Sequence, residues 1–153
     1  QNTNTKKLAA KQQEIFEKQI EDSLQLANWL SEQTSDNFVQ SSGGEIDHSF
    51  AKRVADEIVR ITTNLSRMDS TIKGYKQLSA SVRKLEQSLN SNGYELEVLL
   101  NKPYDNGMNL QANFVIDENL KEGESVITRV IKPQINFKGI LIQAAQVEVS
   151  QGE

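Results

Sequence analysis

The stretch FAKRVADEIVRITTNLSRMDSTIKGYKQLSASVRKLEQSL, residues 50–89, decides the fold of this chain. Its large apolar residues follow one another at steps of three and four: Phe50, Val54, Ile58, Ile61, Leu65, Met68, Ile72, Tyr75, Leu78, Val82, Leu85 and Leu89. This spacing places one continuous apolar stripe along one side of a helix, which is typical of bundle and coiled-coil seams. The sequence therefore predicts an elongated helical interaction protein.

Residues 69–74 leave two interpretations of this helix open. Gly74 costs about 1 kcal/mol relative to alanine inside a helix, and the preceding Asp-Ser-Thr at 69–71 is a weak helix former. The stripe nevertheless crosses the segment without a change of phase, because Met68 and Ile72 keep the helical spacing. We favour one helix from Asp47 to Asn90, bent near Gly74. The alternative is two helices broken at 69–74.

An apolar stripe of this length needs a partner surface. We predict that it joins two copies of the chain into a homodimer, since coiled-coil seams bury stripes of this kind. The residues predicted to form the dimer contact are Phe50, Val54, Ile58, Ile61, Leu65, Met68 and Ile72.

A first helix is predicted upstream, at about residues 6–35. Leu8, Ile15, Phe16, Ile20, Leu24, Ala27 and Leu30 follow one side of it. Trp29 lies beside them and is predicted to anchor a bundle. The segment 35–49 is rich in Ser, Gly, Asp and Asn and predicts a loop. Asp47 suits the N-cap of the next helix, and His48 beside it is interpreted as a surface residue.

After Gly93, which suits the left-handed position that ends a helix, the apolar period changes from 3.6 to 2. Alternation at 94–100, 108–116, 125–132 and 140–150 predicts four strands, with Gly139 at the turn before the last. The predicted fold class is α+β. Residues 1–92 form a helical dimerisation region, with helices at about 6–35 and 47–91, and residues 93–153 form a small β-rich partner-binding domain.

Composition excludes several classes of function. The 153 residues include 17 basic and 21 acidic ones, interspersed, with a net charge of −4. Nucleic-acid binding needs clustered basic residues, so no nucleic-acid partner is expected. No apolar run approaches the roughly 18 residues of a membrane span, so no membrane association is expected. The chain has no cysteine, which fits a cytoplasmic protein. Because it begins with Gln1 rather than Met, we expect that preceding residues were removed.

No set of residues predicts catalysis. Adjacent acidic pairs such as Glu21-Asp22 and Asp56-Glu57 point in different directions on a helix, whereas acid–base catalysis needs converging carboxylates. The single histidine has no partners for a triad or a metal site. We therefore predict a protein without enzymatic activity, metal or cofactor.

Four segments resemble one known family. They are NLSRMD (64–69), GYKQLSASVRKLEQSLNSNGYE (74–95), KPYDNGM (102–108) and EGESVITRVIKPQINFKGILIQAAQVEVS (122–150). Their order and spacing, over roughly residues 50–150, are similar to those of the GrpE-type nucleotide exchange factors, the co-chaperones of DnaK-class chaperones. The chain resembles a divergent member of that family. The resemblance implies helices followed by a small C-terminal β domain.

The resemblance also implies a function and a set of contacts. It implies a co-chaperone that binds a DnaK-type or related ATPase through its β domain and promotes nucleotide release. Two arginines of the family's last hairpin, which are expected to touch the chaperone, fall on Ile140 and Gln143 here. The family's Gly-Tyr falls on Gln134-Ile135, and the His-Glu of its middle motif is absent. The segment between 69 and 74 is also shorter than the family's helix–loop–helix reversal, as a continuous helix would require.

The predicted partner-binding residues are Tyr104, Met108, Ile140, Gln143 and Gln146. Uncharged amides on a sheet suit a protein contact, because they are desolvated more cheaply than charges; they suit plain solvent-facing positions equally well. The alternative to the co-chaperone is a non-enzymatic dimeric scaffold or assembly module that binds a different protein.

Overall fold

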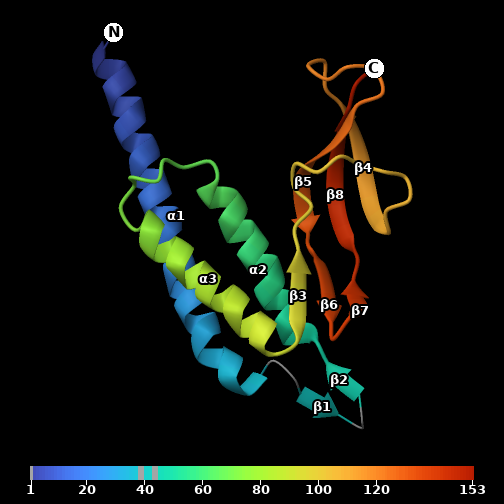
Figure 1. Cartoon of the computed structure of the whole chain (residues 1–153). Helices are drawn as coiled ribbons and strands as arrows, with labels where there is room; N and C mark the ends of the chain where they lie inside the picture. The colour runs from blue at the N-terminus through green and yellow to red at the C-terminus, as the bar shows by residue number, and fades with distance from the viewer. Residues whose placement is uncertain (1, 38–39, 43–44) are drawn as a thin grey trace.

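The computed structural model describes residues 2–37, 40–42 and 45–153, in which three helices pack beside a β module (Figure 1). The helices are α1 (Asn2–Asn37), α2 (Ser49–Leu65) and α3 (Tyr75–Ser91). In Figure 1, α1 descends from the N terminus, α2 rises again and α3 descends beside it. The α+β class and the long N-terminal helix are confirmed.

The single helix predicted from Asp47 to Asn90 is wrong, and the alternative of two helices is right. Gly74 has φ +87°, a left-handed conformation that cannot continue a helix, and it stands at the N-cap of α3. The carboxylate of Asp69 accepts hydrogen bonds from the backbone N–H and the hydroxyl of Thr71, at 2.9 and 2.8 Å. This local turn competes with helix. The chain therefore reverses direction between α2 and α3.

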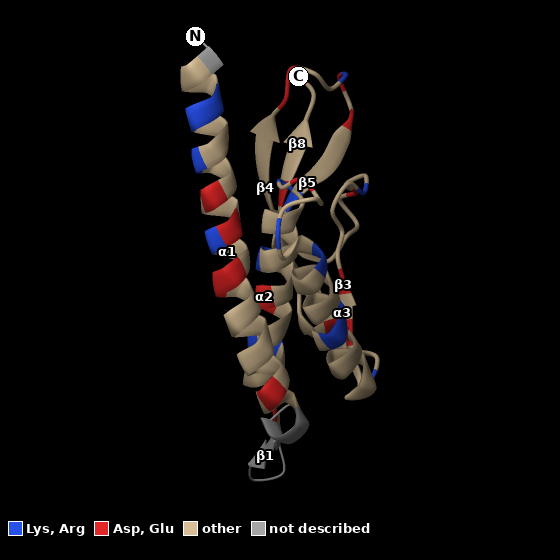
Figure 2. Cartoon of the chain, turned by 90° about the vertical axis from the view of Figure 1, so that its left-hand side faces the viewer, with Lys and Arg blue, Asp and Glu red and all other residues tan. Residues whose placement is uncertain are grey.

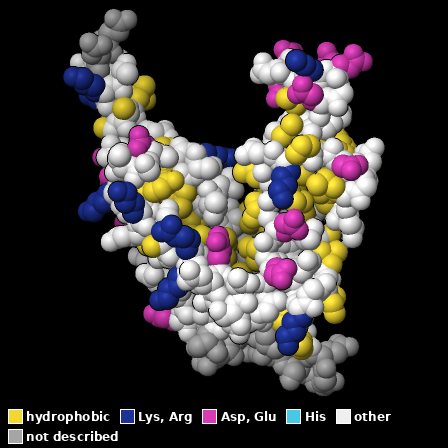
Figure 3. Space-filling model, viewed as in Figure 1, with side chains coloured by type: hydrophobic (Ala, Val, Ile, Leu, Met, Phe, Trp, Pro, Cys, Tyr) yellow, Lys and Arg dark blue, Asp and Glu magenta, His cyan; other side chains and the backbone are white. Residues whose placement is uncertain are grey.

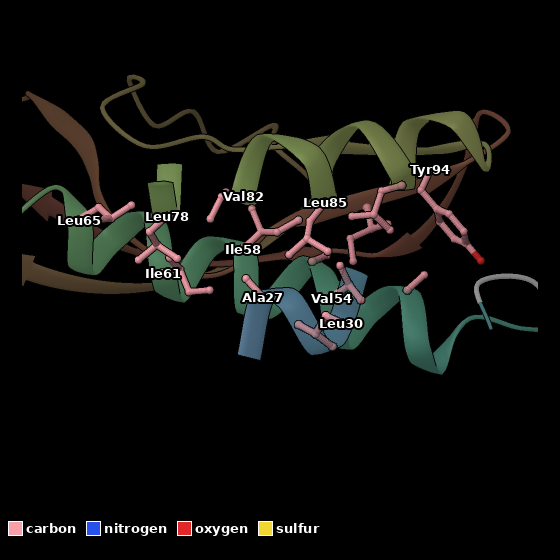
Figure 4. Close-up of a cluster of buried hydrophobic side chains, with 14 of the residues drawn as sticks. Ala27, Leu30, Val54, Ile58, Ile61, Leu65, Leu78, Val82, Leu85 and Tyr94 are labelled. Atoms are coloured by element: carbon pink, nitrogen blue, oxygen red, sulfur yellow. The ribbon is translucent and has the colours of Figure 1, made fainter. Parts of the chain in front are cut away.

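The apolar stripe keeps its spacing across this turn because both halves face one core. Figure 4 shows Ala27 and Leu30 of α1 beside Val54 of α2, with α3 residues such as Leu85 packed against the same cluster. Met68 and Ile72, which lie in the turn, are half-buried against that cluster as well. α2, α3 and the part of α1 from Ile20 onward thus bury their apolar faces within one chain.

The C-terminal part contains six strands rather than the four predicted. They are β3 (Tyr94–Glu97), β4 (Leu110–Ile116), β5 (Ser125–Lys132), β6 (Gln134–Phe137), β7 (Ile140–Gln143) and β8 (Ala145–Gln151). They form two sheets of three strands, with strand orders β3-β6-β7 (the first sheet) and β4-β8-β5 (the second sheet). All pairs are antiparallel except β4 and β8, which are parallel.

Two short interruptions account for the extra strands. Pro133, which has no N–H to give to a ladder, separates β5 from β6. Ala144 separates β7 from β8, and the chain passes there from the first sheet to the second. The predicted fourth strand, 140–150, therefore contributes to both sheets. Gly139 occupies the β6–β7 turn as predicted, with φ +82°.

Two apolar clusters hold the molecule together, and the larger one crosses residue 93. Tyr94, Ile135 and Phe137 of the first sheet are buried in the same cluster as the three helices. The second sheet has its own cluster, built around Ile127, Val147 and Val149, to which Val59 of α2 also belongs. The β module is thus packed onto the helices rather than tethered to them.

The predicted loop at 35–49 contains a small hairpin of β1 (Gln40–Ser42) and β2 (Glu45–Asp47). Residues 38–39 and 43–44 of that loop lie outside the described residues. The carboxylate of Asp47 accepts hydrogen bonds from the backbone N–H and the hydroxyl of Ser49, at 2.9 and 2.6 Å. These bonds lower the pKa of Asp47. Asp47 thus bonds the first turn of α2, although His48 stands at the N-cap position.

Candidate protein-binding surfaces

The residues predicted to form a dimer contact lie in the core of one chain. Val54, Ile58, Ile61 and Leu65 are buried, and Phe50, Met68 and Ile72 are half-buried beside them. The helices that cover the stripe are α1 and α3 of the same chain. A homodimer remains a prediction, but the apolar stripe that led to it is largely covered within one chain.

Exposed apolar side chains occur instead on the first turns of α1. Leu8 is 70% exposed and Ile15 is 48% exposed. Figure 2 shows that this end of α1 extends past the other two helices. Trp29, predicted as a bundle anchor, is 44% exposed, and the Arg53 guanidinium lies 5.3 Å from the centre of its ring, as in a cation–π contact.

The five predicted partner-binding residues do not form one surface. Ile140 and Gln143 belong to β7 in the first sheet. Gln146 lies in β8 of the second sheet, and Tyr104 and Met108 are half-buried against the apolar cluster of that sheet. The structure therefore divides the predicted site between the two sheets.

The hairpin tip, residues 138–141, is the most exposed apolar part of the first sheet. Ile140 is 69% exposed and Leu141 is 40% exposed. Two contacts anchor the tip: the Lys138 N–H donates a hydrogen bond to the Gly93 carbonyl at 2.9 Å, and the adjacent Phe137 is buried. The hairpin tip thus presents apolar side chains from a fixed position.

Gln143 is engaged inside the chain. Its Nε2 donates to the Pro133 carbonyl at 3.0 Å and to the Asp56 carboxylate at 3.2 Å. The second bond links β7 to α2. Gln143 therefore positions β7 against the helices, and its contact with a partner remains a prediction.

The second sheet exposes an apolar strand end that the sequence reasoning missed. Phe114, Val115 and Ile116, at the end of β4, are 49%, 39% and 62% exposed. The ring of Tyr104 stands edge-on to that of Phe114, with centroids 5.4 Å apart. Three consecutive large apolar residues break the alternation of the strand, and this feature of the sequence could have indicated that some of them are exposed.

β4 is also an open edge of the second sheet. The Asp117 N–H donates to the Gln151 carbonyl at 2.9 Å, so by alternation the N–H groups of Ala112, Phe114 and Ile116 point away from β8. Nothing in the described part of the chain bonds to them. Strand β4 has no charged residue and no proline, the usual protections of an edge.

The interpretation of His48 as a plain surface residue is wrong. The hydroxyl of Tyr94 lies 2.6 Å from His48 Nδ1, and the histidine ring also packs on Phe137, with centroids 4.7 Å apart. Burial raises the pKa of Tyr94, and the negative charge of Asp47 raises it further. This aromatic cluster joins the start of α2 to the first sheet.

Metal-ligating clusters and membrane-spanning helices are both absent from the described residues. Over residues 2–37, 40–42 and 45–153, no three His, Asp or Glu side chains gather as a metal site would require. Among the helices of that part, none combines the length and apolar content needed to cross a bilayer. No family model matches this chain, and no curated protein matches it.

Proposed function

We propose that this chain is a GrpE-like co-chaperone that binds a DnaK-type ATPase through its β module and promotes nucleotide release. The β module binds the open form of the nucleotide-binding domain more tightly than the closed form. Nucleotide release follows from this difference in affinity, without any chemical step on the exchange factor. The proposal assumes a cytoplasmic location and no enzymatic activity.

The observation that carries the proposal is the exposed hairpin tip. Ile140 stands where the resemblance implies a chaperone contact, and its side chain is 69% exposed beside Leu141. An apolar residue in place of an arginine suits a partner whose matching surface is apolar as well. The reversal between α2 and α3 also supports the proposal, because the resemblance implies a helix–loop–helix reversal at that point.

The proposal includes a homodimer, with the contact placed on α1. Leu8 and Ile15 are exposed and seven residues apart, which is the repeat of a coiled-coil seam. Light scattering at micromolar concentration should give the mass of two chains. The double variant Leu8→Asp, Ile15→Asp should give one folded chain, whereas Leu65→Asp should unfold the chain. A wild-type monomer would contradict the dimer.

Nucleotide release tests the exchange activity. A DnaK-type ATPase of the source organism is loaded with a fluorescent ADP analogue and chased with excess ATP, with and without this protein. We expect a faster loss of fluorescence that saturates with protein concentration. Ile140→Lys should raise the half-maximal concentration about tenfold or more, because losing a buried isoleucine contact costs about 1.5–3 kcal/mol.

Ile116→Lys is the matched control for this experiment. Ile116 is 62% exposed in the same β module but lies in the second sheet. Its substitution should leave the rate of release unchanged. The exchange proposal fails if no DnaK-type ATPase of the source organism releases nucleotide faster with the wild-type protein.

The open edge of β4 favours a second candidate function. A non-enzymatic scaffold or assembly module could add a strand of its partner to this edge, because the outward N–H groups and apolar side chains suit strand addition. In that case Ile116→Lys should abolish capture of the native partner and Ile140→Lys should not. Recovery of the partner by both variants would exclude this candidate.

A further inference from the structure

A groove runs between the helices and the β module, and neither the resemblance nor the proposed function accounts for it. Three neighbouring cavities compose it: an acidic cavity of about 440 Å³, a central cavity of about 380 Å³ and a basic cavity of about 210 Å³. Figure 3 shows the molecule hollowed between the helices and the β module, with hydrophobic side chains along the β-module side. The volumes of the acidic and central cavities fall within the range of ligand pockets, about 300–1,000 Å³, and the basic cavity is smaller.

Shared lining residues make the three cavities continuous. Glu86 and Val98 line both the acidic and the central cavity. Arg67 and Arg129 line both the central and the basic cavity. An extended ligand can therefore contact all three.

The middle of the groove is apolar. Ile58 and Val59 of α2 line one side, and Val98, Leu100 and Val130 of the β module line the other. Val98 and Leu100 are 45% and 40% exposed. The other three are buried, so the exposed apolar area lies on the β-module side, where it suits an apolar ligand group because covering it removes apolar area from water.

The two ends carry opposite charge. Glu86 and Glu95 line the acidic cavity without a basic residue. Three arginines line the basic cavity together with one acid: Arg60, Arg67, Arg129 and Asp56.

Internal contacts compensate only part of these charges. Arg60 forms an ion pair with Glu57 at 2.7 Å, and Asp56 accepts the bond from Gln143. Glu148, in the central cavity, is the cross-strand neighbour of Arg129. Arg67 has no ion pair within the described ranges. At the other end the positive charge of Arg83 acts on Glu86, whereas Glu95 has no ion pair among the described residues. The two ends therefore keep opposite signs.

We propose that this groove binds an extended peptide segment of a partner protein. The segment places apolar side chains in the central cavity, a basic residue at Glu86 and Glu95, and an acidic residue at Arg67 and Arg129. Because neighbouring cavities share lining residues, a single extended segment, which advances about 3.3 Å per residue, can contact all three. The inference stands apart from the proposed exchange activity, because it concerns a different surface from the hairpin tip.

The test uses the full chain and a defined synthetic peptide. The probe is the fluorescein-labelled, N-acetylated and C-amidated peptide Lys-Lys-Ala-Leu-Val-Leu-Ala-Glu-Glu; the control replaces its Leu-Val-Leu with Ser-Ser-Ser. Fluorescence polarisation gives the affinity, and amide chemical shifts in NMR spectra locate the site. We expect shifts at Val98, Leu100 and Val130, at least about fivefold weaker binding of the control, and weaker binding at high salt.

Charge exchange at the two ends makes the test specific. Arg67→Glu alone or Glu95→Lys alone should weaken binding about fivefold or more, because each brings like charges together. The double variant should bind more weakly than either single variant, because Glu86 and Arg129 keep their charges and neither direction of the peptide then matches both ends. Both residues are exposed, so neither change disturbs the core.

Four results would overturn the inference. The first is equal affinity for the probe and the control peptide, and the second is chemical-shift changes confined to β4 or the hairpin tip. The third is a double variant that binds the probe no more weakly than either single variant. The fourth is chemical-shift changes in the groove that depend on protein concentration when no peptide is present. The last would show a second copy in the groove. Nucleotide exchange does not enter this test, so failure of the exchange proposal and failure of this one are told apart.

Discussion

Replacing Gly74 with alanine should change the free energy of unfolding in opposite directions for a chain reversal and for a continuous helix. A helix through this position would gain about 1 kcal/mol from alanine. In the structure Gly74 has φ +87°, and an added Cβ would lie 2.7 Å from Cγ2 of Ile20. We therefore expect Gly74→Ala to lower the free energy of unfolding.

The magnitude follows from three contributions. The left-handed conformation costs a non-glycine residue roughly 1–2 kcal/mol, and overpacking against α1 adds about 1–3 kcal/mol. The reduced freedom of the unfolded chain returns about 0.4–1 kcal/mol. Together they predict a loss of about 1–4.6 kcal/mol at Gly74, measured by urea unfolding followed by far-ultraviolet circular dichroism.

Two further variants separate the backbone cost from the steric one. Gly139 has φ +82° and no atom within 4 Å of an added Cβ, so Gly139→Ala should lose only about 1 kcal/mol. Ile20→Ala removes the clashing atom, and Gly74→Ala should then cost about 1–3 kcal/mol less than in the wild-type chain. Unchanged or greater stability of Gly74→Ala would refute the reasoning.

Three further predictions concern burial and hydrogen bonding. Burial raises the pKa of Glu86 above its ordinary 4.5, so the folded state disfavours the charged carboxylate and the free energy of unfolding falls as the pH rises above 4.5. Glu86→Gln should therefore be more stable than wild type in urea unfolding at pH 7, and the gain should vanish below pH 4.5. Tyr94→Phe removes the hydroxyl that lies 2.6 Å from His48 Nδ1 and should lower the free energy of unfolding by about 1 kcal/mol at pH 7, measured by thermal unfolding. Burial also raises the pKa of Tyr94 above 10.0, so the wild type should lose more stability than the variant as the pH rises above 10.0. Asn136 Oδ1 is buried and has no hydrogen-bond partner among the described residues, so Asn136→Leu should raise the free energy of unfolding by about 1 kcal/mol; a loss would show that the amide is satisfied.

Local periodicity predicted the helices well but not their connection. The spacing through Met68 and Ile72 indicated one helix, because residues in a turn that contacts the core keep the same apolar spacing as a helix. Gly74 and Asp69 carried the contrary signal: one adopts positive φ and the other bonds Thr71. Whether the chain continues as a helix or turns here depends on the packing of α1 against α3. That contact joins residues far apart in the sequence, so local spacing cannot predict it.

The strands were predicted by alternation, and the sheets were not. Alternation cannot show that Ala144 takes the chain from one sheet to the other, or that the four residues of β6 form a central strand. The predicted partner residues consequently fell on two surfaces. Sequence spacing also could not find the groove, because its two sides come from α2 and from the β module.

The parallel pairing of β4 with β8 has a consequence for how the chain folds during synthesis. Strand β8 is the central strand of the second sheet, yet it follows both of its neighbours in the chain. A ribosome therefore releases β4 and β5 before the strand that pairs with both exists. Contacts so distant in sequence form slowly, and until they form the Phe-Val-Ile end of β4 is available for unwanted association. We expect this sheet to be the last part of the molecule to become protected from hydrogen exchange during refolding.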